Sequence, residues 1–176
     1  MTDRSTDTGA SVAPEIRSLA RAASRYFIKR SAIAGIFEKE GRSHYSRYEK
    51  IDTRPCERLV QEHMSGEKTL ALPLLEDGRG KRVLLIYGGD ERELFANTVR
   101  YLCNFLGMEN YTLYDAGEDI QLHIYFDESR DTRSLYDYGV EFSSMLEKRI
   151  ARSWKILPDP TLPDEINLYK LPYFVY

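Results

Sequence analysis

Apolar residues recur along this chain at two spacings, one typical of strands and one typical of helices. From residue 82 onward these patterns alternate in the order β-α-β-β-α-β. The predicted elements are RVLLIYG (82–88), a helix over 90–106, YTLYD (111–115), IQLHIYF (120–126), a helix over 132–150 and a last strand in INLYKLPYFVY (166–176). This order fits an α+β domain with two helices on one face of a mostly antiparallel sheet.

Local signals set the limits of several elements. Asp90 together with Glu93 forms a capping-box pattern, which predicts a helix start, and Gly107 predicts the end of that helix. The segment EDGRGK lies between the apolar runs TLALPLL (69–75) and RVLLIYG, which predicts a hairpin. Pro73 cannot donate a hydrogen bond to a neighbouring strand, so its strand is expected at an edge or at a bulge.

An α/β extension is expected before this sheet. Residues 1–13 are small and polar, which predicts a disordered tail followed by a single domain over residues 14–176. One helical pattern begins at Pro14 and another covers residues 55–64. Between them, RSHYSRYEKID (42–52) contains few aliphatic residues, which predicts an exposed loop or an irregular strand.

Charge and composition restrict the classes of function. The chain has 25 Lys and Arg residues against 28 Asp and Glu residues, a net charge of -3, so any site for a polyanion must be a local patch. No apolar run approaches the ~18 residues that cross a bilayer, and the first residues lack the apolar core of a secretion signal. We therefore expect a cytoplasmic protein with no membrane partner.

No complete catalytic or metal-binding set of residues can be assembled from the sequence. Cys56, His63 and Cys103 lack a fourth ligand and the spacing of a zinc site, and Cys103 fits a helix as a small apolar residue. No serine has the surroundings of a hydrolase nucleophile, and the glycines of DGRGK do not follow the pattern of a phosphate-binding loop. We therefore expect neither a metal ion nor a cofactor.

Cations and aromatic rings alternate in one polar segment. Single-stranded nucleic acid is held by such alternation, because cations contact the phosphates while flat rings stack on the bases. The candidate binding residues are Arg42, Tyr45, Arg47, Tyr48 and Lys50. The alternative is a tyrosine-rich loop that packs on the sheet.

Three stretches of the chain occur in an order that a known family shares. They are HMSGEKTLALPLLEDGRGKRVLLIYGGD (63–90), IQLHIYF (120–126) and WKILPDPTLPDEINLYKLPYF (154–174). In this order, and together spanning about residues 43–175, they resemble the archaeo-eukaryotic primases, the primase-polymerase superfamily. The resemblance implies an antiparallel palm like that of an RNA-recognition motif, with an N-terminal α/β extension. It also implies a site where paired carboxylates hold divalent metals for phosphoryl transfer.

The positions that would hold these metals carry other residues. On this resemblance the two aspartates of the family correspond to Tyr87 and Gly89, and its third carboxylate falls near Trp154. The resemblance thus implies a degenerate bacterial member of unknown function that is not an enzyme. The alternative, an active metal-dependent nucleotidyltransferase, would need displaced carboxylates, for which the candidates are Asp90, Asp115 and Asp119.

Three further residues are candidates for nucleotide contact. The nucleotide-contacting histidine of the family corresponds to Gln121, or to His123 if the register slips by two residues, although a histidine on a half-buried strand is commonly structural. Lys155 matches a basic position of the family. We therefore expect a non-catalytic domain that binds single-stranded nucleic acid or a nucleotide. A domain whose tyrosine-rich surface binds a protein partner is the other alternative.

Overall fold

The computed structural model describes residues 34–39, 46–51, 57–65, 69–151 and 154–176. Its strands are β1 (Ala34–Lys39), β2 (Ser46–Ile51), β3 (Thr69–Pro73), β4 (Arg79–Tyr87), β5 (Tyr111–Asp115), β6 (Ile120–Asp131), β7 (Trp154–Leu157), β8 (Leu168–Lys170) and β9 (Phe174–Val175). Its helices are α2 (Glu57–Met64), α3 (Arg92–Phe105), α4 (Thr132–Leu146) and the 3-10 turn η1 (Asp164–Ile166). The predicted tail 1–13 and the helix predicted from Pro14 lie outside the described residues.

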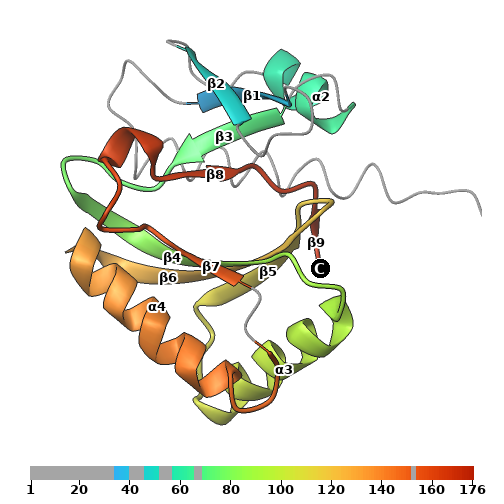
Figure 1. Cartoon of the computed structure of the whole chain (residues 1–176), viewed down its shortest axis with the longest axis vertical. Helices are drawn as coiled ribbons and strands as arrows, with labels where there is room; N and C mark the ends of the chain where they lie inside the picture. The colour runs from blue at the N-terminus through green and yellow to red at the C-terminus, as the bar shows by residue number, and fades with distance from the viewer. Residues whose placement is uncertain (1–33, 40–45, 52–56, 66–68, 152–153) are drawn as a thin grey trace, which may run out of the picture.

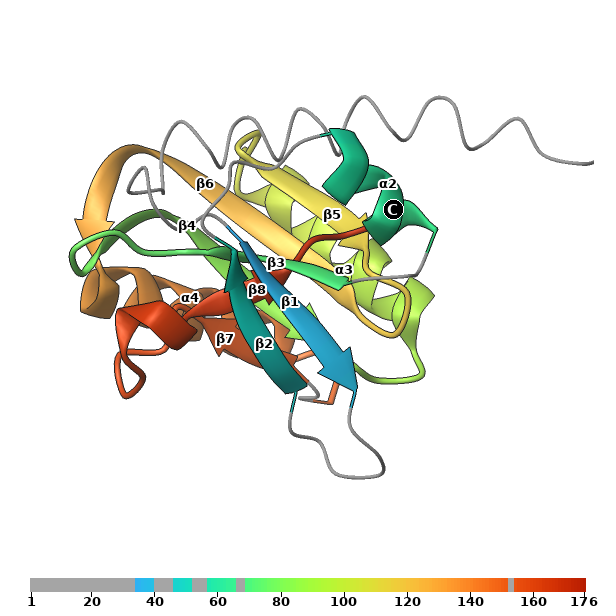
Figure 2. The ribbon, with the colours of Figure 1, turned by 90° about the horizontal axis from the view of Figure 1, so that it is seen from above.

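Two sheets and a helical layer are stacked in the molecule (Figure 1). The four-stranded sheet has the order β2-β1-β3-β8, and the five-stranded sheet has the order β7-β4-β6-β5-β9. Seen from above, the four-stranded sheet lies over one face of the five-stranded sheet (Figure 2), while α3 and α4 cover the other face. No helix among the described residues is long and apolar enough to cross a membrane.

The predicted order β-α-β-β-α is present as β4, α3, β5, β6 and α4, but the strand that follows α4 is β7, over residues that were not predicted to form a strand. The strand pairs of the five-stranded sheet are antiparallel, so this part of the predicted fold is confirmed. Gly139 allows α4 to lie close to the sheet, because a Cβ there would lie 2.5 Å from Cγ2 of Ile156 and 3.0 Å from Cγ1 of Val83. The helix side of the sheet therefore includes Val83 and Ile156.

The hairpin expected between β3 and β4 is wrong. Its turn does form, with Asp77 and Gly78 at φ angles of 51° and 72° and a bridge between Glu76 and Arg79. Beyond this bridge the strands separate, because β3 pairs with β1 and β8 whereas β4 pairs with β6 and β7. Pro73 is therefore not on an edge strand. It is the last residue of β3, where its missing N–H removes no hydrogen bond from the middle of a ladder.

The last predicted strand is divided between the two sheets. β8 pairs with β3 in the four-stranded sheet, and β9 pairs with β5 in the five-stranded sheet. Between them, the N–H of Leu171 donates to the carbonyl of Leu70, and the N–H of Tyr173 donates to the carbonyl of Asp115. Pro172, which has no N–H, separates these two contacts. The C-terminal segment thus connects both sheets.

The expected capping box at Asp90 and Glu93 is also wrong. The N-cap of α3 is Glu91, which makes no capping hydrogen bond with its side chain. Instead, the Tyr87 hydroxyl accepts a hydrogen bond from the Glu91 N–H at 3.2 Å, so a residue of β4 fixes the loop before the helix. The segment predicted as a loop or irregular strand over residues 42–52 contains the regular strand β2.

Candidate nucleic-acid or nucleotide site

The face of the five-stranded sheet that carries Gln121 and His123 packs against the four-stranded sheet. Residues directly opposite in an antiparallel pair lie on the same face, and the register pairs Leu84 with His123 and Ile86 with Gln121. The His123 ring contacts the ring of Tyr169, from β8 of the other sheet, edge to face with centroids 5.2 Å apart. This face is therefore an interior layer between the sheets.

A buried arginine organises this layer. Arg82 is 2% exposed, and its Nη1 donates to the Tyr169 hydroxyl at 2.6 Å. Its guanidinium also lies 5.0 Å from the ring centroid of Tyr125 and 5.2 Å from that of Tyr169. Aromatic rings attract a desolvated cation, so these two rings stabilise the buried positive charge. Sequence reasoning missed Arg82, although an arginine that begins the apolar run RVLLIY is a visible signal.

Gln121 and His123 continue this polar network. His123 Nδ1 lies 3.4 Å from Arg82 Nη1, and because the guanidinium only donates, the ring proton belongs on Nε2. Nε2 then donates to Gln121 Oε1 at 2.9 Å, and Gln121 Nε2 donates to the carbonyl of Lys170 at 3.0 Å. Burial, and next the positive charge of Arg82, hold the pKa of His123 well below its ordinary value of 6.5. His123 is therefore neutral.

Neither of these two side chains is accessible to a ligand in this conformation. Gln121 is 1% exposed and His123 is 0% exposed. Their hydrogen bonds connect one sheet to the other, so the structural alternative accounts for His123. Their position between the sheets indicates a structural role.

Tyr87 and Trp154, at positions that the resemblance assigns to lost metal ligands, have side chains that contact the helices. The Tyr87 ring stacks on Phe95 of α3, with centroids 4.5 Å apart, and Trp154 Nε1 donates to Ser143 Oγ of α4 at 2.7 Å. Both side chains therefore lie on the helix side of the sheet, away from Gln121 and His123. The β4 residues on the Gln121 face alternate along the strand and are Arg82, Leu84 and Ile86. None of these residues is a carboxylate.

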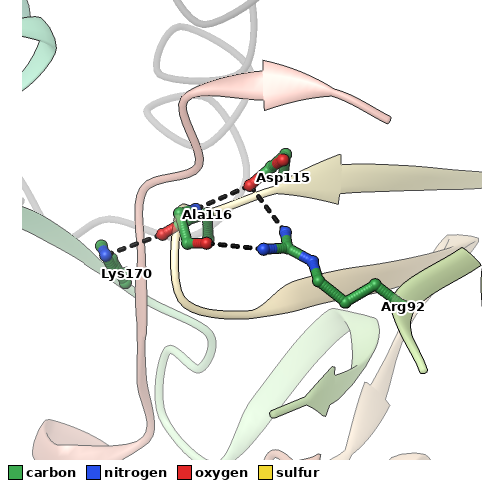
Figure 3. Close-up of polar contacts among 5 residues, drawn as sticks. Arg92, Asp115, Ala116 and Lys170 are labelled. Carbon is green, nitrogen blue, oxygen red and sulfur yellow. Dashed lines mark hydrogen bonds and ion pairs between the residues drawn. The ribbon is translucent and has the colours of Figure 1, made fainter. Parts of the chain in front are cut away.

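A polar corner lies where β5 turns into β6 (Figure 3). Arg92 donates from Nη2 to Asp115 Oδ1 at 2.9 Å and from Nη1 to the Gly117 carbonyl at 2.8 Å. Asp115 Oδ1 also accepts the N–H of Gly117, and Lys170 Nζ donates to the Ala116 carbonyl at 2.7 Å. Asp115 therefore stabilises the turn through its neighbours.

Asp119 lies beside this turn and close to the end of β4. A Cβ on Gly88 would lie 3.1 Å from Asp119 Oδ1. Burial raises the pKa of Asp119 above its ordinary value of 3.8, although the positive charges of Lys170, Lys155 and Arg92 oppose this rise. Of these cations, Lys155 is on β7, opposite Ile86 in the register, and is exposed. We call Gly88, Arg92, Asp119, Lys155 and Lys170 the strand-end corner.

The strand-end corner does not suit a divalent metal. A cation that is already close to a carboxylate opposes the binding of a second cation there. Asp115 is paired with Arg92, and Asp90 is exposed in the loop before α3. Within the part of the chain that the structure describes, no three His, Cys, Asp or Glu side chains form a group that could hold a metal ion.

The basic and aromatic segment is only partly described. Arg42 and Tyr45 lie outside the described residues, whereas Arg47, Tyr48 and Lys50 belong to β2, at the end of the strand order. The register pairs Tyr48 with Phe37, Lys50 with Gly35 and Arg47 with Glu38. Strand residues alternate between the faces of a sheet, so Tyr48 and Lys50 belong to one face and Arg47 to the other.

Comparisons with known proteins bear on the fold. A family model described as "Domain of unknown function (DUF1882)" matches residues 15–81. A comparison with curated protein sequences gives no match. The chain is similar in structure to the primase-polymerase (AEP) domain of cyanophage S-2L, with a TM-score of 0.50 and 11% identity over 93% of this chain and 92% of that one.

A second similar structure is the polymerase domain of Mycobacterium tuberculosis ligase D in complex with DNA. Its TM-score is 0.45, with 14% identity over 84% of this chain and 70% of that one. The similarity to the phage domain confirms the predicted α+β architecture, with antiparallel sheets arranged as in a primase-polymerase palm.

Proposed function

We propose that this chain is a non-catalytic, primase-polymerase-like domain that binds single-stranded nucleic acid or a nucleotide. The observation that carries the proposal is that the β4 residues on the Gln121 face, Arg82, Leu84 and Ile86, include no carboxylate, while the cation Lys155 is exposed at the strand-end corner. Two-metal phosphoryl transfer requires several carboxylate oxygens on adjacent strands. A site that has cations but lacks such a set of carboxylates favours the binding of phosphate groups over phosphoryl transfer.

For single-stranded nucleic acid we propose β2 as the contact surface. Tyr48 and Lys50 share one face of this strand, a combination of ring and cation that suits a base and its phosphate. The net charge of -3 means that such binding depends on this local surface and not on the overall field.

The test is a fluorescence anisotropy titration of a labelled single-stranded oligonucleotide at low salt. Tyr48→Ala is expected to weaken binding by about 1–3 kcal/mol if a base stacks on the ring. Lys50→Ala is expected to weaken it for all sequences and to reduce its salt dependence, because phosphate contacts release counterions. Arg47→Ala, on the other face of the same strand, is the matched control and should have little effect. Absence of binding by the unmodified chain at low salt would refute this part of the proposal.

For a nucleotide we propose the strand-end corner, with Lys155 as its accessible cation. Titration with a nucleoside triphosphate should show affinity that is unchanged when magnesium is replaced by a chelator. Lys155→Ala should weaken this binding without changing that of the oligonucleotide. Binding that requires magnesium would instead support the alternative of an enzyme with displaced carboxylates.

A further inference from the structure

The interior layer between the two sheets opens to solvent at the end of β4. The register places Lys155 of β7 opposite Ile86, and Gly88 comes two residues later, just after the strand ends. Lys155 and Gly88 are exposed and Ile86 is half-buried, whereas Leu84, the preceding residue of this face, is buried. This end of the face is therefore accessible to a ligand in the present conformation.

The Asp119 carboxylate lies beside this opening. A Cβ on Gly88 would lie 3.1 Å from Asp119 Oδ1, so the missing side chain leaves this oxygen uncovered on that side. Asp119 is half-buried, and with the described residues its carboxylate forms no hydrogen bond and no ion pair. Burial of the charged form is the main reason why the pKa of Asp119 is raised above 3.8. A ligand that donates hydrogen bonds would stabilise this carboxylate.

Three cations lie near Asp119, and two of them are directed to the turn between β5 and β6. Figure 3 shows that Arg92 and Lys170 donate to groups of this turn. The third, Lys155, is exposed and forms no ion pair with another described residue. Its charge is close enough to Asp119 to oppose the rise in the pKa of that carboxyl. Among the described residues of the strand-end corner, Lys155 and Asp119 are therefore the two charged groups available to a ligand.

A ligand for both groups must carry a negative charge close to neutral hydrogen-bond donors. In the sheet, β4 separates β7 from β6, a distance of about 10 Å that the long Lys155 side chain shortens. A phosphate suits the lysine, whereas a second cation beside Asp119 would be opposed by the cations already there. Two vicinal hydroxyl groups suit the carboxylate, because each of its oxygens can accept from one of them.

We propose that Asp119 accepts hydrogen bonds from the 2′- and 3′-hydroxyl groups of a ribonucleotide whose phosphates pair with Lys155. This role rests on the proposed binding of a nucleotide at the strand-end corner, and it specifies the sugar that the corner selects. The hydroxyl groups and the 5′-phosphate belong to one sugar, which matches two side chains that are separated by a single strand. Ile86, on that strand, offers an apolar contact to the sugar ring. A nucleotide without these hydroxyl groups would leave the carboxylate without donors.

The edge of a nucleobase fits this arrangement less well. A base edge can also donate two hydrogen bonds to a carboxylate, but it lies beyond the sugar, at the far end of the nucleotide from the phosphates. The ribose hydroxyl groups are the donors nearest to the phosphate that Lys155 would hold. We therefore expect adenosine and guanosine triphosphate to bind with similar affinity.

The test is titration calorimetry of the full-length chain with adenosine 5′-triphosphate and with its 2′,3′-dideoxy analogue, both in the presence of a chelator. We expect the ribonucleotide to bind at least about tenfold more tightly, because hydrogen bonds to a charged group are stronger than those between neutral groups. The 2′-deoxy analogue should have an intermediate affinity. This comparison uses the unmodified chain, so it does not depend on the folding of a variant.

Variants of the corner test whether Asp119 is the group that selects the sugar. Asp119→Asn should reduce the preference for the ribonucleotide to less than about threefold. The dideoxy analogue should bind this variant at least as tightly as before, because a negative charge near its phosphates is removed. Gly88→Ala should also reduce the preference, because its methyl group would lie 3.1 Å from Asp119 Oδ1. Glu118→Gln, which removes the exposed carboxylate next to Asp119, is the matched control and should leave the preference unchanged.

Several outcomes would overturn the proposal. Equal affinity of the unmodified chain for the two nucleotides, both weakened by Lys155→Ala, would refute the role of Asp119 but leave the proposed nucleotide site in place. An Asp119→Asn variant that binds both nucleotides more tightly to the same extent would show that Asp119 only repels phosphate. A preference for guanosine over adenosine triphosphate that Asp119→Asn removes would assign the carboxylate to the base. Absence of binding of every nucleotide would refute both the selection of ribose and the proposed nucleotide site.

Discussion

The side chain of Arg82 reaches from the five-stranded sheet to Tyr169 of the four-stranded sheet, and almost none of it contacts solvent. Burying a charged side chain is costly unless its N–H groups find acceptors and nearby groups stabilise its charge. Here a hydroxyl, an imidazole and two aromatic faces perform this role. The contact between the sheets therefore depends on a few polar atoms as well as on apolar packing.

Replacing Tyr169 with phenylalanine tests this dependence. The substitution keeps the ring but removes the hydroxyl that accepts from Arg82 at 2.6 Å. We expect the free energy of unfolding to fall by about 1–3 kcal/mol, because a buried charged donor loses its acceptor. Urea denaturation measures this change. Tyr101→Phe, at an exposed ring, is the control and should change stability by less than about 0.5 kcal/mol.

His123 should make the stability of the chain depend on pH. Its pKa is held well below 6.5 in the folded protein, mainly by burial and then by Arg82, whereas the unfolded chain binds a proton near the ordinary value. Stability is therefore complete above about pH 6.5 and declines as the pH falls below it. Between about pH 7.5 and pH 5.5 the unmodified chain should lose about 1.4 kcal/mol more than a His123→Gln variant.

The measurement is urea denaturation of both chains at the two pH values. Comparing the chains removes the contribution of every other titrating group. Equal losses in the two chains would show that His123 is protonated or exposed in the folded state. Such a result would restore His123 as a candidate for ligand contact.

Single residues show why site prediction from the sequence was incomplete. The sequence identified Gln121 and His123 as polar residues on an otherwise apolar strand, but it did not predict their burial. The burial comes from Tyr169 and Lys170, which are more than forty residues away in the chain and belong to another sheet. No local pattern reports such a contact, because it depends on which strand β8 joins.

Elements with a strong local pattern were predicted correctly. The β5–β6 hairpin, α3 and α4 each have regular apolar spacing and agree with the structure to within a few residues. The turn between β3 and β4 was predicted correctly, but the hairpin was not. The local sequence predicts the turn, whereas the pairing of each strand depends on partners that are distant in the chain. The strand β2 was predicted only as an exposed loop or an irregular strand, because its residues are mostly polar and give no clear apolar alternation.

The contact between α4 and the sheet can be tested at Gly139. An added Cβ would lie 2.5 Å from Cγ2 of Ile156, a branched side chain with little freedom to move. We expect Gly139→Ala to lower the unfolding free energy by about 1–2 kcal/mol, because crowding in the core outweighs the gain in helix propensity. Ser144→Ala, on the exposed side of α4, should be nearly neutral in the same thermal and urea unfolding experiments. Stabilisation by Gly139→Ala would mean that the helix lies further from the sheet.

On the scale of the whole molecule, the fold is similar to that of a primase-polymerase domain, and β4 contains no Asp or Glu. We expect no primer extension and no synthesis without a primer, with magnesium or manganese, in a radiolabelled nucleotide assay. Loss of even one well-placed electrostatic group commonly costs about a hundredfold in rate, and here the carboxylates of β4 are absent altogether. The expected result is product at the level of the protein-free control.

An Ile86→Asp, Gly88→Asp double variant tests whether the fold can still hold metal-binding carboxylates. It places one carboxylate on the face of β4 that Gln121 shares and another just after the strand ends, unlike changes at Tyr87, whose ring stacks on Phe95. Gain of metal binding by this variant would show that the scaffold still accommodates the ligands. Metal-dependent incorporation by the unmodified chain that Asp119→Asn abolishes would instead show that this is an active enzyme.

The pairing of β8 with β3 determines which fragments of the chain keep both partner strands of β3. Residues 15–81, over which the family of unknown function is recognised, contain β1 to β3 but not β8, which pairs with Ala71, Leu72 and Pro73. A fragment limited to those residues would expose one edge of β3, and an apolar strand with an open edge promotes aggregation. We therefore expect that the region recognised by sequence does not fold when it is transferred alone to another protein. Recombination that preserves the fold must exchange both ends of the chain together.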